Sequence, residues 1–228
     1  MSQLFIVATP IGNLEDISLR ALRILKEVDL ILCEDTRKTQ KLLISYKIKK
    51  PLISYHQHSS LQKIKKITAL LQEGKDLALV TDSGTPGVSD PGNILVASVR
   101  EKLPDVVIIP IPGPSAITTM ISVAGIAMDK FLFLGFPPKK RKKKQFFQQI
   151  INSPYPVVFY ESPYRIKKTL EGILDLAQQD NCQLQALIGR ELTKKFETFY
   201  YGSLEEVIDQ LKKGISRGEF TVLLKVVS

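Results

Sequence analysis

The sequence is poor in the residues from which disulfide frameworks and zinc sites are built. Its 228 residues include two cysteines, Cys33 and Cys182, and two histidines. Two cysteines are too few for a disulfide framework, and neither lies in the Cys-x-x-Cys spacing that is typical of zinc sites. We therefore expect two buried, reduced thiols and no bound metal ion.

An export signal is also missing from the start of the sequence. The segment MSQLFIVATPIGN has neither the basic head nor the long apolar core of a signal peptide. This predicts a cytoplasmic protein with no membrane partner. With 44% hydrophobic and 24% charged residues, the chain has the composition of a globular protein and is long enough for one large domain or two small ones.

Neither of the two commonest nucleotide-binding loops is present, because the sequence contains no GxxxxGK[ST] and no GxGxxG. A different loop, within LVTDSGTPGVSDPG (79–92), carries three glycines and two prolines after an apolar run. Glycine permits positive φ and the close approach of a ligand, whereas proline stiffens the backbone. The loop suits a preformed surface for a flat or extended small molecule, although an ordinary rigid turn between a strand and a helix would look the same.

Apolar, β-rich runs alternate with amphipathic segments, which is the pattern of α/β proteins. Strands are expected at 4–8, 30–33, 51–55, 76–81 and 106–110, with helices at 17–28, 36–46, 60–74, 93–103 and from Pro112. After Gly125 the pattern restarts, with strands expected at 131–136, 157–160, 184–192, 198–202 and 220–227 and helices near 142–151, 163–178 and 203–213. We predict two α/β domains, 1–117 and 118–228, with a linker near 117–130. The first sheet should be mainly parallel, and short connections between the late strands indicate a mixed second sheet.

Two further loops rich in proline and glycine follow predicted strands. They are TPIGN (9–13), after the first strand, and PGPSA (112–116), after the fifth. Ligands of α/β sheets bind beyond the carboxyl ends of the strands, where loops expose backbone N–H groups. The three loops are therefore predicted to emerge from one edge of the first sheet and to form one ligand site.

Six motifs, in this order and spacing, closely resemble the ribosomal RNA small subunit methyltransferase I family: VATPIGNLEDISLRAL, CEDTRKTQKLL, TDSGTPGVSDPG, IPGPSA, FLGFPP and FYESPYR. The resemblance implies methylation of the ribose 2′-hydroxyl of a cytidine in the 16S ribosomal RNA of the small ribosomal subunit. It also implies two α/β domains of the tetrapyrrole methylase type, which bind S-adenosylmethionine in a cleft between them, and a homodimer. Many members continue for several dozen residues after the final strand, whereas this sequence stops at Ser228.

The resemblance also implies which residues contact the cofactor. Backbone groups, rather than side chains, would hold the methionine moiety and the ribose, which would explain the bare loop. Ser83 stands where alanine is frequent in the family, a change that should matter little, and Thr221 would lie near the adenine. The implied contacts are Pro10, Ser83, Gly84, Thr85, Val88, Ser115, Ala116, Glu161, Leu192 and Thr221.

Methyl transfer to a hydroxyl is an in-line displacement, so the enzyme must align the reacting atoms and exclude water. A general base could help the weakly nucleophilic ribose hydroxyl to lose its proton. The candidates are Glu34, Asp35 and Arg37 of the motif CEDTR, which follows the second strand. Capping of the next helix is an alternative role for either carboxylate. Arg37 is better suited to holding a phosphate or bracing the loop than to proton chemistry.

Two groups of residues are candidates for RNA contact. His56 and His58 form an HxH pair after the third strand. Two imidazoles are too few for a zinc site; a similar histidine-containing stretch in the family implies substrate contact, and a solvated loop remains the alternative. The run KKRKKK accounts for the whole net charge of residues 118–228. Such a run is often only a solvated segment, but in a protein expected to bind ribosomal RNA it suits phosphate contact. The cations concerned are Lys139, Lys140, Arg141, Lys142, Lys143 and Lys144, with Arg165 further along the chain.

Two other functions stay open at this stage. A precorrin-type tetrapyrrole methylase would also place a polycarboxylate substrate in a basic cleft, although the motifs CEDTR and FYESPYR match the RNA family. A non-catalytic ribosome-assembly factor could keep the cofactor-binding fold as a scaffold. Transfer of a labelled methyl group to small subunits, naked 16S RNA or a precorrin distinguishes these functions.

Overall fold

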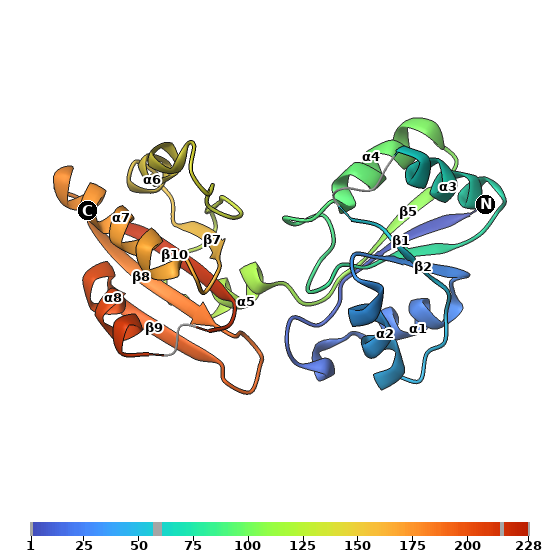
Figure 1. The fold of residues 1–228 in the computed structure, drawn as a ribbon, viewed down its shortest axis with the longest axis horizontal. Coiled ribbons are helices and arrows are strands. Elements are labelled where there is room, and N and C mark those ends of the chain that lie inside the picture. Colours follow the sequence, from blue (N-terminus) through green and yellow to red (C-terminus); the bar gives the residue numbers. More distant parts are fainter. Residues whose placement is uncertain (1, 57–60, 215–216, 228) are drawn as a thin grey trace. The chain divides into compact units, whose positions relative to one another are not determined.

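The computed structural model describes residues 2–56, 61–214 and 217–227 and divides into two compact units, Met1–Ser115 and Ala116–Ser228 (Figure 1). Each unit is built around one five-stranded sheet with helices packed on it. In the part of the chain that the structure describes, no helix is long and apolar enough to cross a membrane.

The first unit contains a parallel sheet with the strand order β3-β2-β4-β1-β5, which confirms the parallel arrangement predicted for it. Each helix connects two parallel strands, as expected for an α/β sheet. The strands are β1 (Gln3–Val7), β2 (Leu30–Cys33), β3 (Leu52–Ser54), β4 (Leu77–Leu79) and β5 (Val107–Ile111), and the helices are α1 (Leu19–Glu27), α2 (Thr36–Ser45), α3 (Leu61–Gln72) and α4 (Gly92–Lys102).

Both faces of the central strands β2, β4 and β1 are buried, which explains why these strands are continuous apolar runs. Alternate residues of a strand point to opposite faces. Leu4 and Leu77 belong to the apolar cluster that α3 and α4 cover, whereas their neighbours Phe5 and Ala78 belong to the cluster that α1 and α2 cover. The two helix pairs lie on opposite sides of the sheet in Figure 1.

The second unit contains a sheet with the order β6-β7-β10-β8-β9. Strands β6 and β7 are parallel and the other neighbours are antiparallel, so the mixed sheet is confirmed. Helices α6, α7 and α8 pack in the apolar cluster on one face, and α5 packs on the other through Met120. The elements are α5 (Ala116–Ser122), β6 (Leu132–Phe133), α6 (Lys143–Ile151), β7 (Val157–Glu161), α7 (Ile166–Gln179), β8 (Gln183–Arg190), β9 (Thr198–Ser203), α8 (Leu204–Lys213) and β10 (Phe220–Val227).

Several boundaries expected from the sequence are wrong; for example, the helix expected near 163–178 begins at Ile166, and the strand expected at 76–81 ends at Leu79. The first helix begins at Leu19 rather than at residue 17, because the Ser18 hydroxyl caps it by accepting a hydrogen bond from the Ala21 N–H. The strand expected at 131–136 ends at Phe133, and Gly135 has a φ of 65°. The helix expected from Pro112 begins at Ala116. Its residues pack against the second sheet, so much of the segment expected as a linker at 117–130 is part of the second unit.

Candidate cofactor and substrate sites

Three loops are joined at one edge of the first sheet, where the neighbouring strands β4, β1 and β5 end. Thr9 and Gly84 exchange two backbone hydrogen bonds, with N···O distances of 2.9 and 3.1 Å. The Thr85 hydroxyl donates to the Pro114 carbonyl at 3.1 Å. The three loops rich in proline and glycine therefore lie together, as their positions in the sequence predicted.

Gly84 occupies the centre of this arrangement with a φ of +83°, a conformation that side chains disfavour. A Cβ atom at this position would lie 3.3 Å from Ile11 Cγ2 and 3.6 Å from the Pro114 carbonyl oxygen. On either side of Gly84, the backbone N–H groups of Ser83 and Thr85 have no acceptor among the described residues. The loop thus combines a bare backbone with two donors that could bind a small polar ligand.

Asp90 fixes the second half of the same loop. Its carboxylate accepts hydrogen bonds from the N–H groups of Gly87 at 2.8 Å, Val88 at 3.1 Å and Gly92 at 2.8 Å. The Val88 N–H is therefore already used within the loop, so a ligand contact by Val88 would involve its carbonyl or its side chain. Sequence reasoning overlooked Asp90, although aspartate followed by proline and glycine is a known turn-forming signal.

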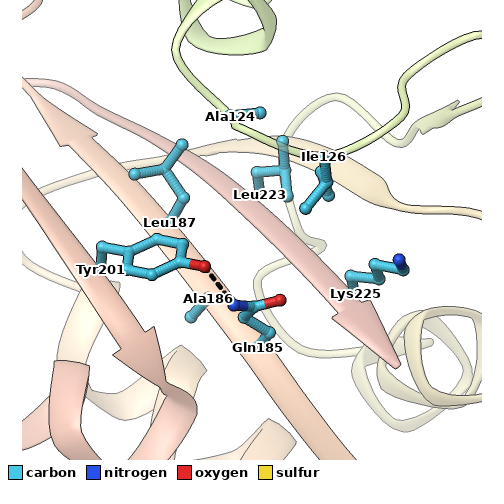
Figure 2. A pocket seen from close by; sticks show the side chains of 8 residues that line it. All are labelled: Ala124, Ile126, Gln185, Ala186, Leu187, Tyr201, Leu223 and Lys225. Carbon is cyan, nitrogen blue, oxygen red and sulfur yellow. Dashed lines mark hydrogen bonds between the residues drawn. The ribbon is translucent and has the colours of Figure 1, made fainter. Parts of the chain in front are cut away.

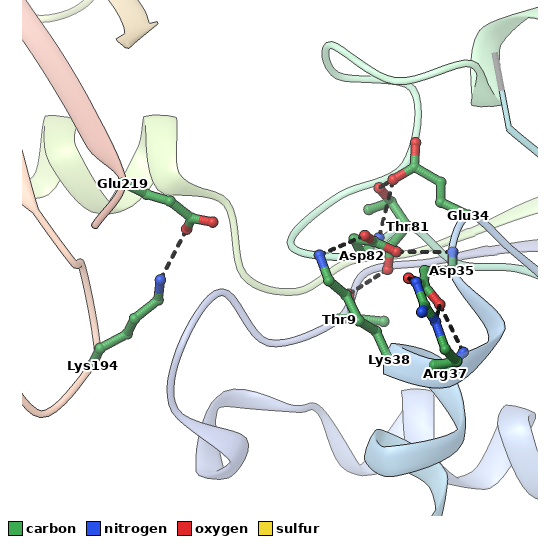
Figure 3. A network of polar contacts seen from close by, with 9 residues as sticks. All are labelled: Thr9, Glu34, Asp35, Arg37, Lys38, Thr81, Asp82, Lys194 and Glu219. Carbon is green, nitrogen blue, oxygen red and sulfur yellow. Dashed lines mark hydrogen bonds and ion pairs between the residues drawn. The ribbon is translucent and has the colours of Figure 1, made fainter. Parts of the chain in front are cut away.

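A polar network joins the ends of β2 and β4 (Figure 3). Glu34 accepts hydrogen bonds from the Thr81 hydroxyl at 3.0 Å and the Asp82 N–H at 3.4 Å. Asp82 in turn accepts from the Asp35 N–H at 3.1 Å and pairs with the Lys38 ammonium at 2.7 Å. Asp82 and Lys38 were not singled out from the sequence, because their pairing depends on the register between two strands.

Asp35 is the N-cap of α2, the alternative role weighed for it. Its carboxylate accepts from the Arg37 N–H at 2.8 Å and pairs with the Arg37 guanidinium at 2.8 Å. The Arg37 side chain is 87% exposed. Hydrogen bonds and the positive charge of Arg37 hold the pKa of Asp35 well below its usual range. A carboxylate with such a low pKa is a weak base, so Asp35 is poorly suited to accept a proton.

In the second unit, Glu161 and Arg165 bind each other. The Glu161 side chain is fully buried, pairs with the Arg165 guanidinium at 2.7 Å and accepts from the Thr169 hydroxyl at 2.8 Å. Arg165 also donates to the Pro137 carbonyl at 3.0 Å. The Arg165 guanidinium, which the buried Glu161 carboxylate orients, therefore joins the motifs FYESPYR and FLGFPP.

The other residues expected at the cofactor lie in two places. Thr221 is buried in β10 between Tyr160 and Gly189 of the neighbouring strands. Leu192 is also buried, and a Cβ atom on Gly189 would lie 2.6 Å from its Cδ2 atom, so the leucine side chain packs directly against this glycine. Pro10 directly follows Thr9, which is hydrogen-bonded to Gly84. Ser115 ends the first unit, and Ala116 begins the second.

The loop that carries Leu192 has an unusual backbone. Glu191 and Thr193, on either side of it, have positive φ values of 54° and 64°. The Lys194 ammonium pairs with Glu191 at 2.9 Å and with Glu219 at 3.0 Å, the second pair being drawn in Figure 3. These ion pairs hold the loop against the start of β10, which fixes the position of Leu192.

The basic run lies between β6 and α6. Five of its six residues are exposed, and Lys143 is half-buried with its ammonium 5.3 Å from the centre of the Phe147 ring. Burial lowers the pKa of Lys143, the Glu161 carboxylate opposes this effect, and the charges of Lys168 and Arg165 lower the pKa further. Arg165 and Lys168 thus lie within electrostatic range of one residue of the run, Lys143.

The histidine pair is only partly within the described chain. His56 is exposed after β3, whereas His58 lies outside the described residues. Within the ranges that the structure describes, no three His, Cys, Asp or Glu side chains are grouped so that they could hold a metal ion.

The fold is that of known methyltransferases. Residues 3–208 match the family Tetrapyrrole (Corrin/Porphyrin) Methylases. The superposition on the crystal structure of the methyltransferase CobJ covers 100% of this chain and 95% of CobJ, with 17% sequence identity and a TM-score of 0.69. The uroporphyrin-III-C-methyltransferase of Thermus thermophilus gives a TM-score of 0.63 at 17% identity over 98% and 94% of the two chains. At this level of identity the likeness establishes the fold.

Closer relatives share more of the sequence. Three proteins named Ribosomal RNA small subunit methyltransferase I are similar in sequence to this chain. The identity is 44% for the protein of Thermotoga maritima, 41% for that of Mycoplasmopsis pulmonis and 39% for that of Bacillus subtilis. The matches cover 98%, 98% and 99% of this chain and 98%, 97% and 75% of the respective relatives. These identities confirm the resemblance of the six motifs. The chain is a methyltransferase that belongs to the ribosomal RNA small subunit methyltransferase I family, within the tetrapyrrole methylases.

Proposed function

We propose that this protein transfers a methyl group from S-adenosylmethionine to the ribose 2′-hydroxyl of a cytidine in the 16S ribosomal RNA of the small ribosomal subunit. The observation that carries the proposal is the 44% identity, over 98% of both chains, with the Thermotoga maritima protein named Ribosomal RNA small subunit methyltransferase I. The 2′-hydroxyl and the cytidine come from the resemblance of the motifs. The reaction takes place in the cytoplasm.

The joined loops of the first unit fit S-adenosylmethionine, which supplies the activated methyl group when bound. The cofactor carries a carboxylate and two ribose hydroxyls. Their oxygen atoms can accept hydrogen bonds from the backbone N–H groups of Ser83 and Thr85. The positive φ of Gly84 keeps the backbone open to such contact. Asp90 holds the loop in one shape before binding, so little conformational entropy is lost when a ligand binds. The remaining contacts proposed are Pro10, Val88, Ser115, Ala116, Glu161, Leu192 and Thr221.

Among the three candidates for proton transfer, Glu34 is the best suited. Its Oε2 atom accepts from Thr81 and Asp82, whereas its Oε1 atom makes no hydrogen bond among the described residues. Asp35 is engaged as a helix cap and in an ion pair with Arg37. We therefore assign to Glu34 the role of accepting the proton of the ribose hydroxyl. Arg37 is assigned to phosphate contact.

The protein is also proposed to act as a homodimer, an expectation that rests on the family. We assign the contact with a second copy to the face of β8, β9 and β10 on which α5 packs, where a small pocket lies (Figure 2). Tyr201 is 54% exposed on this face, and its hydroxyl contacts the Gln185 side chain. Leu187, Leu223 and Ile126 line the same shallow pocket. A single monomeric species in sedimentation at micromolar concentration would contradict the dimer.

The proposed reaction is tested with methyl-labelled S-adenosylmethionine and three acceptors: small ribosomal subunits, naked 16S RNA and a precorrin. We expect label in the RNA of small subunits. The phosphodiester bond that follows the labelled nucleotide should resist alkaline hydrolysis, because its methylated 2′-oxygen cannot attack the phosphate. Label in the precorrin would support a tetrapyrrole methylase instead. Binding of the cofactor with no labelled acceptor would support a non-catalytic assembly factor.

A further inference from the structure

Tyr164 is unusual among the large side chains of the described residues because it is 95% exposed. It lies in the turn between β7 and α7, within the motif FYESPYR. Aromatic rings contribute most when their large apolar faces are covered. In this chain the Tyr164 ring is left almost entirely to solvent, whereas Tyr155, also on the surface, is 43% exposed.

The backbone that carries Tyr164 is held firmly. The N–H groups of Arg165 and Ile166 both donate to the Ser162 carbonyl, at 3.1 and 3.0 Å. The Arg165 guanidinium is anchored to the buried Glu161 carboxylate at 2.7 Å and to the Pro137 carbonyl at 3.0 Å. The backbone of Tyr164 is thus held in place, and the ring has only two side-chain torsions to order, so it loses little conformational entropy when it stacks.

Cations lie in and beside this turn. Arg165 follows Tyr164 directly, and Lys168 is exposed four residues after Tyr164, in the first turn of α7. Burial has the largest effect on the pKa of Lys143 and lowers it, the Glu161 carboxylate raises it, and the charges of Lys168 and Arg165 lower it further. The other residues of the basic run, 139–142 and 144, flank Lys143 in the sequence and are exposed. Like charges that are brought together repel each other, and an anion bound between them relieves that repulsion. The surface therefore combines an unpacked aromatic ring with a positive potential.

We propose that Tyr164, together with Lys143, Arg165 and Lys168, binds an unpaired nucleotide of the RNA substrate, with the ring stacked on its base and the cations on adjacent phosphates. The nucleotide must be unpaired, because bases within an A-form duplex stay stacked inside and their faces are not accessible. Stacking on aromatic rings and tracking of the phosphates by cations are the two contacts by which single strands are bound. The inference rests on the proposed function for the choice of RNA, and it adds the place and the conformation of the bound segment.

The test measures binding of the full chain, without S-adenosylmethionine, to a ten-nucleotide single-stranded RNA that contains one 2-aminopurine, and to the duplex of the same sequence. We expect the wild type to prefer the single strand and to quench the fluorescence of the stacked base. Tyr164→Ala should weaken binding of the single strand by roughly 5- to 100-fold and abolish the quenching. Tyr164→Phe keeps the ring and should retain both. Tyr155→Ala, the matched control on the same unit, should leave both unchanged.

Several results would overturn the inference. One is that the wild type does not bind the single strand. Another is that the wild type and Tyr164→Ala bind the single strand with equal affinity. A third is that Tyr164→Ala loses as much affinity for the duplex as for the single strand. Competition by poly-glutamate as effective as by unlabelled RNA would assign the surface to an acidic protein segment instead. A protein that labels RNA but binds it independently of Tyr164 contradicts this inference alone. A protein that binds the oligonucleotide through Tyr164 but labels no RNA contradicts the proposed function alone.

Discussion

Thr9 and Gly84 donate backbone hydrogen bonds to each other although they are 75 residues apart in the sequence. Their pairing extends beyond the ends of β1 and β4 and joins two loops that would otherwise be separate. Because both bonds are made by the backbone, their geometry depends on the conformation of Gly84 rather than on a side chain.

Gly84→Leu should abolish binding of S-adenosylmethionine in calorimetry while circular dichroism shows a folded protein. A side chain here combines a left-handed backbone, which costs roughly 1–2 kcal/mol for a residue with a Cβ, with contact against Ile11 and Pro114. Gly87→Ala is the control, because Gly87 also has a positive φ but a Cβ there meets no atom within 4 Å. Unchanged affinity of Gly84→Leu would remove this loop from the cofactor site.

Asp90→Ala should weaken both the fold and cofactor binding, because three N–H groups lose their charged acceptor. Hydrogen bonds to charged groups contribute roughly 1.5–3 kcal/mol each when buried, so for this partly exposed loop we expect a loss of about 2 kcal/mol in the free energy of unfolding in urea. Asp105→Ala is the matched control, since Asp105 is exposed in a turn. Equal stability of the two variants would show that Asp90 does not hold the loop.

Glu34→Gln should lower the rate of methyl transfer by at least roughly 100-fold, the lower range for loss of a general base. The affinity for S-adenosylmethionine should remain. Asp35→Asn should change the rate only a few-fold, because asparagine caps a helix as well as aspartate does. The assignment of Glu34 fails if Asp35→Asn is the slower enzyme of the two, or if Glu34→Gln loses affinity for the cofactor rather than rate.

Replacement of Lys139, Lys140, Lys142 and Lys143 by glutamine should weaken binding to small subunits and flatten its dependence on salt. Each phosphate contact that is lost removes roughly 0.7 to 0.9 from the logarithmic salt slope. Cofactor affinity, measured in parallel, should not change. A salt slope equal to that of the wild type would identify the run as a solvated segment.

Tyr160 predicts a loss of stability at high pH. Its ring packs against the rings of Phe133 and Phe136, with distances between ring centres of 5.1 and 5.4 Å. Burial raises the pKa of Tyr160 from 10.0 to about 12. Above pH 10 the unfolded chain therefore releases a proton that the folded protein keeps, so the contribution of this group to stability is complete below that pH and falls as pH rises toward about 12. Compared with Tyr160→Phe, the wild type should lose stability more steeply over this interval in denaturant titrations. Parallel curves would contradict the prediction.

The elements and the joined loops could be predicted because their signals are local. The alternation of apolar runs with amphipathic segments set the two sheets, and TPIGN, TDSGTPGVSDPG and PGPSA each follow a strand. The start of α5 was missed by four residues, since proline at 112 and 114 suits both a loop and the first turn of a helix.

The contacts between strands were not predictable in the same way. The pairing of Asp82 with Lys38 needs the strand order, which places β2 beside β4, and the register between them. Tyr164 was quoted within a motif, but nothing in the sequence distinguishes a buried tyrosine from an exposed one. Glu161 was assigned to the cofactor by resemblance, and its burial against Arg165 and Thr169 appeared only in three dimensions.

The strand order of the first sheet has a consequence for synthesis of the chain on the ribosome. Strand β1 is the first to be made, yet its two partners are β4 and β5, which end at Leu79 and Ile111. Nascent β1 therefore has no hydrogen-bonding partner until β4 is made, after about a third of the chain, and lacks its second partner until about half of the chain is made. Such distant pairings slow folding. The Thr9–Gly84 clamp can close only after β1 and β4 have paired, so the proposed cofactor loop is among the last parts of this unit to form. Substitutions that weaken β5 should accordingly reduce the yield of active protein during expression more than they reduce the stability of the purified protein.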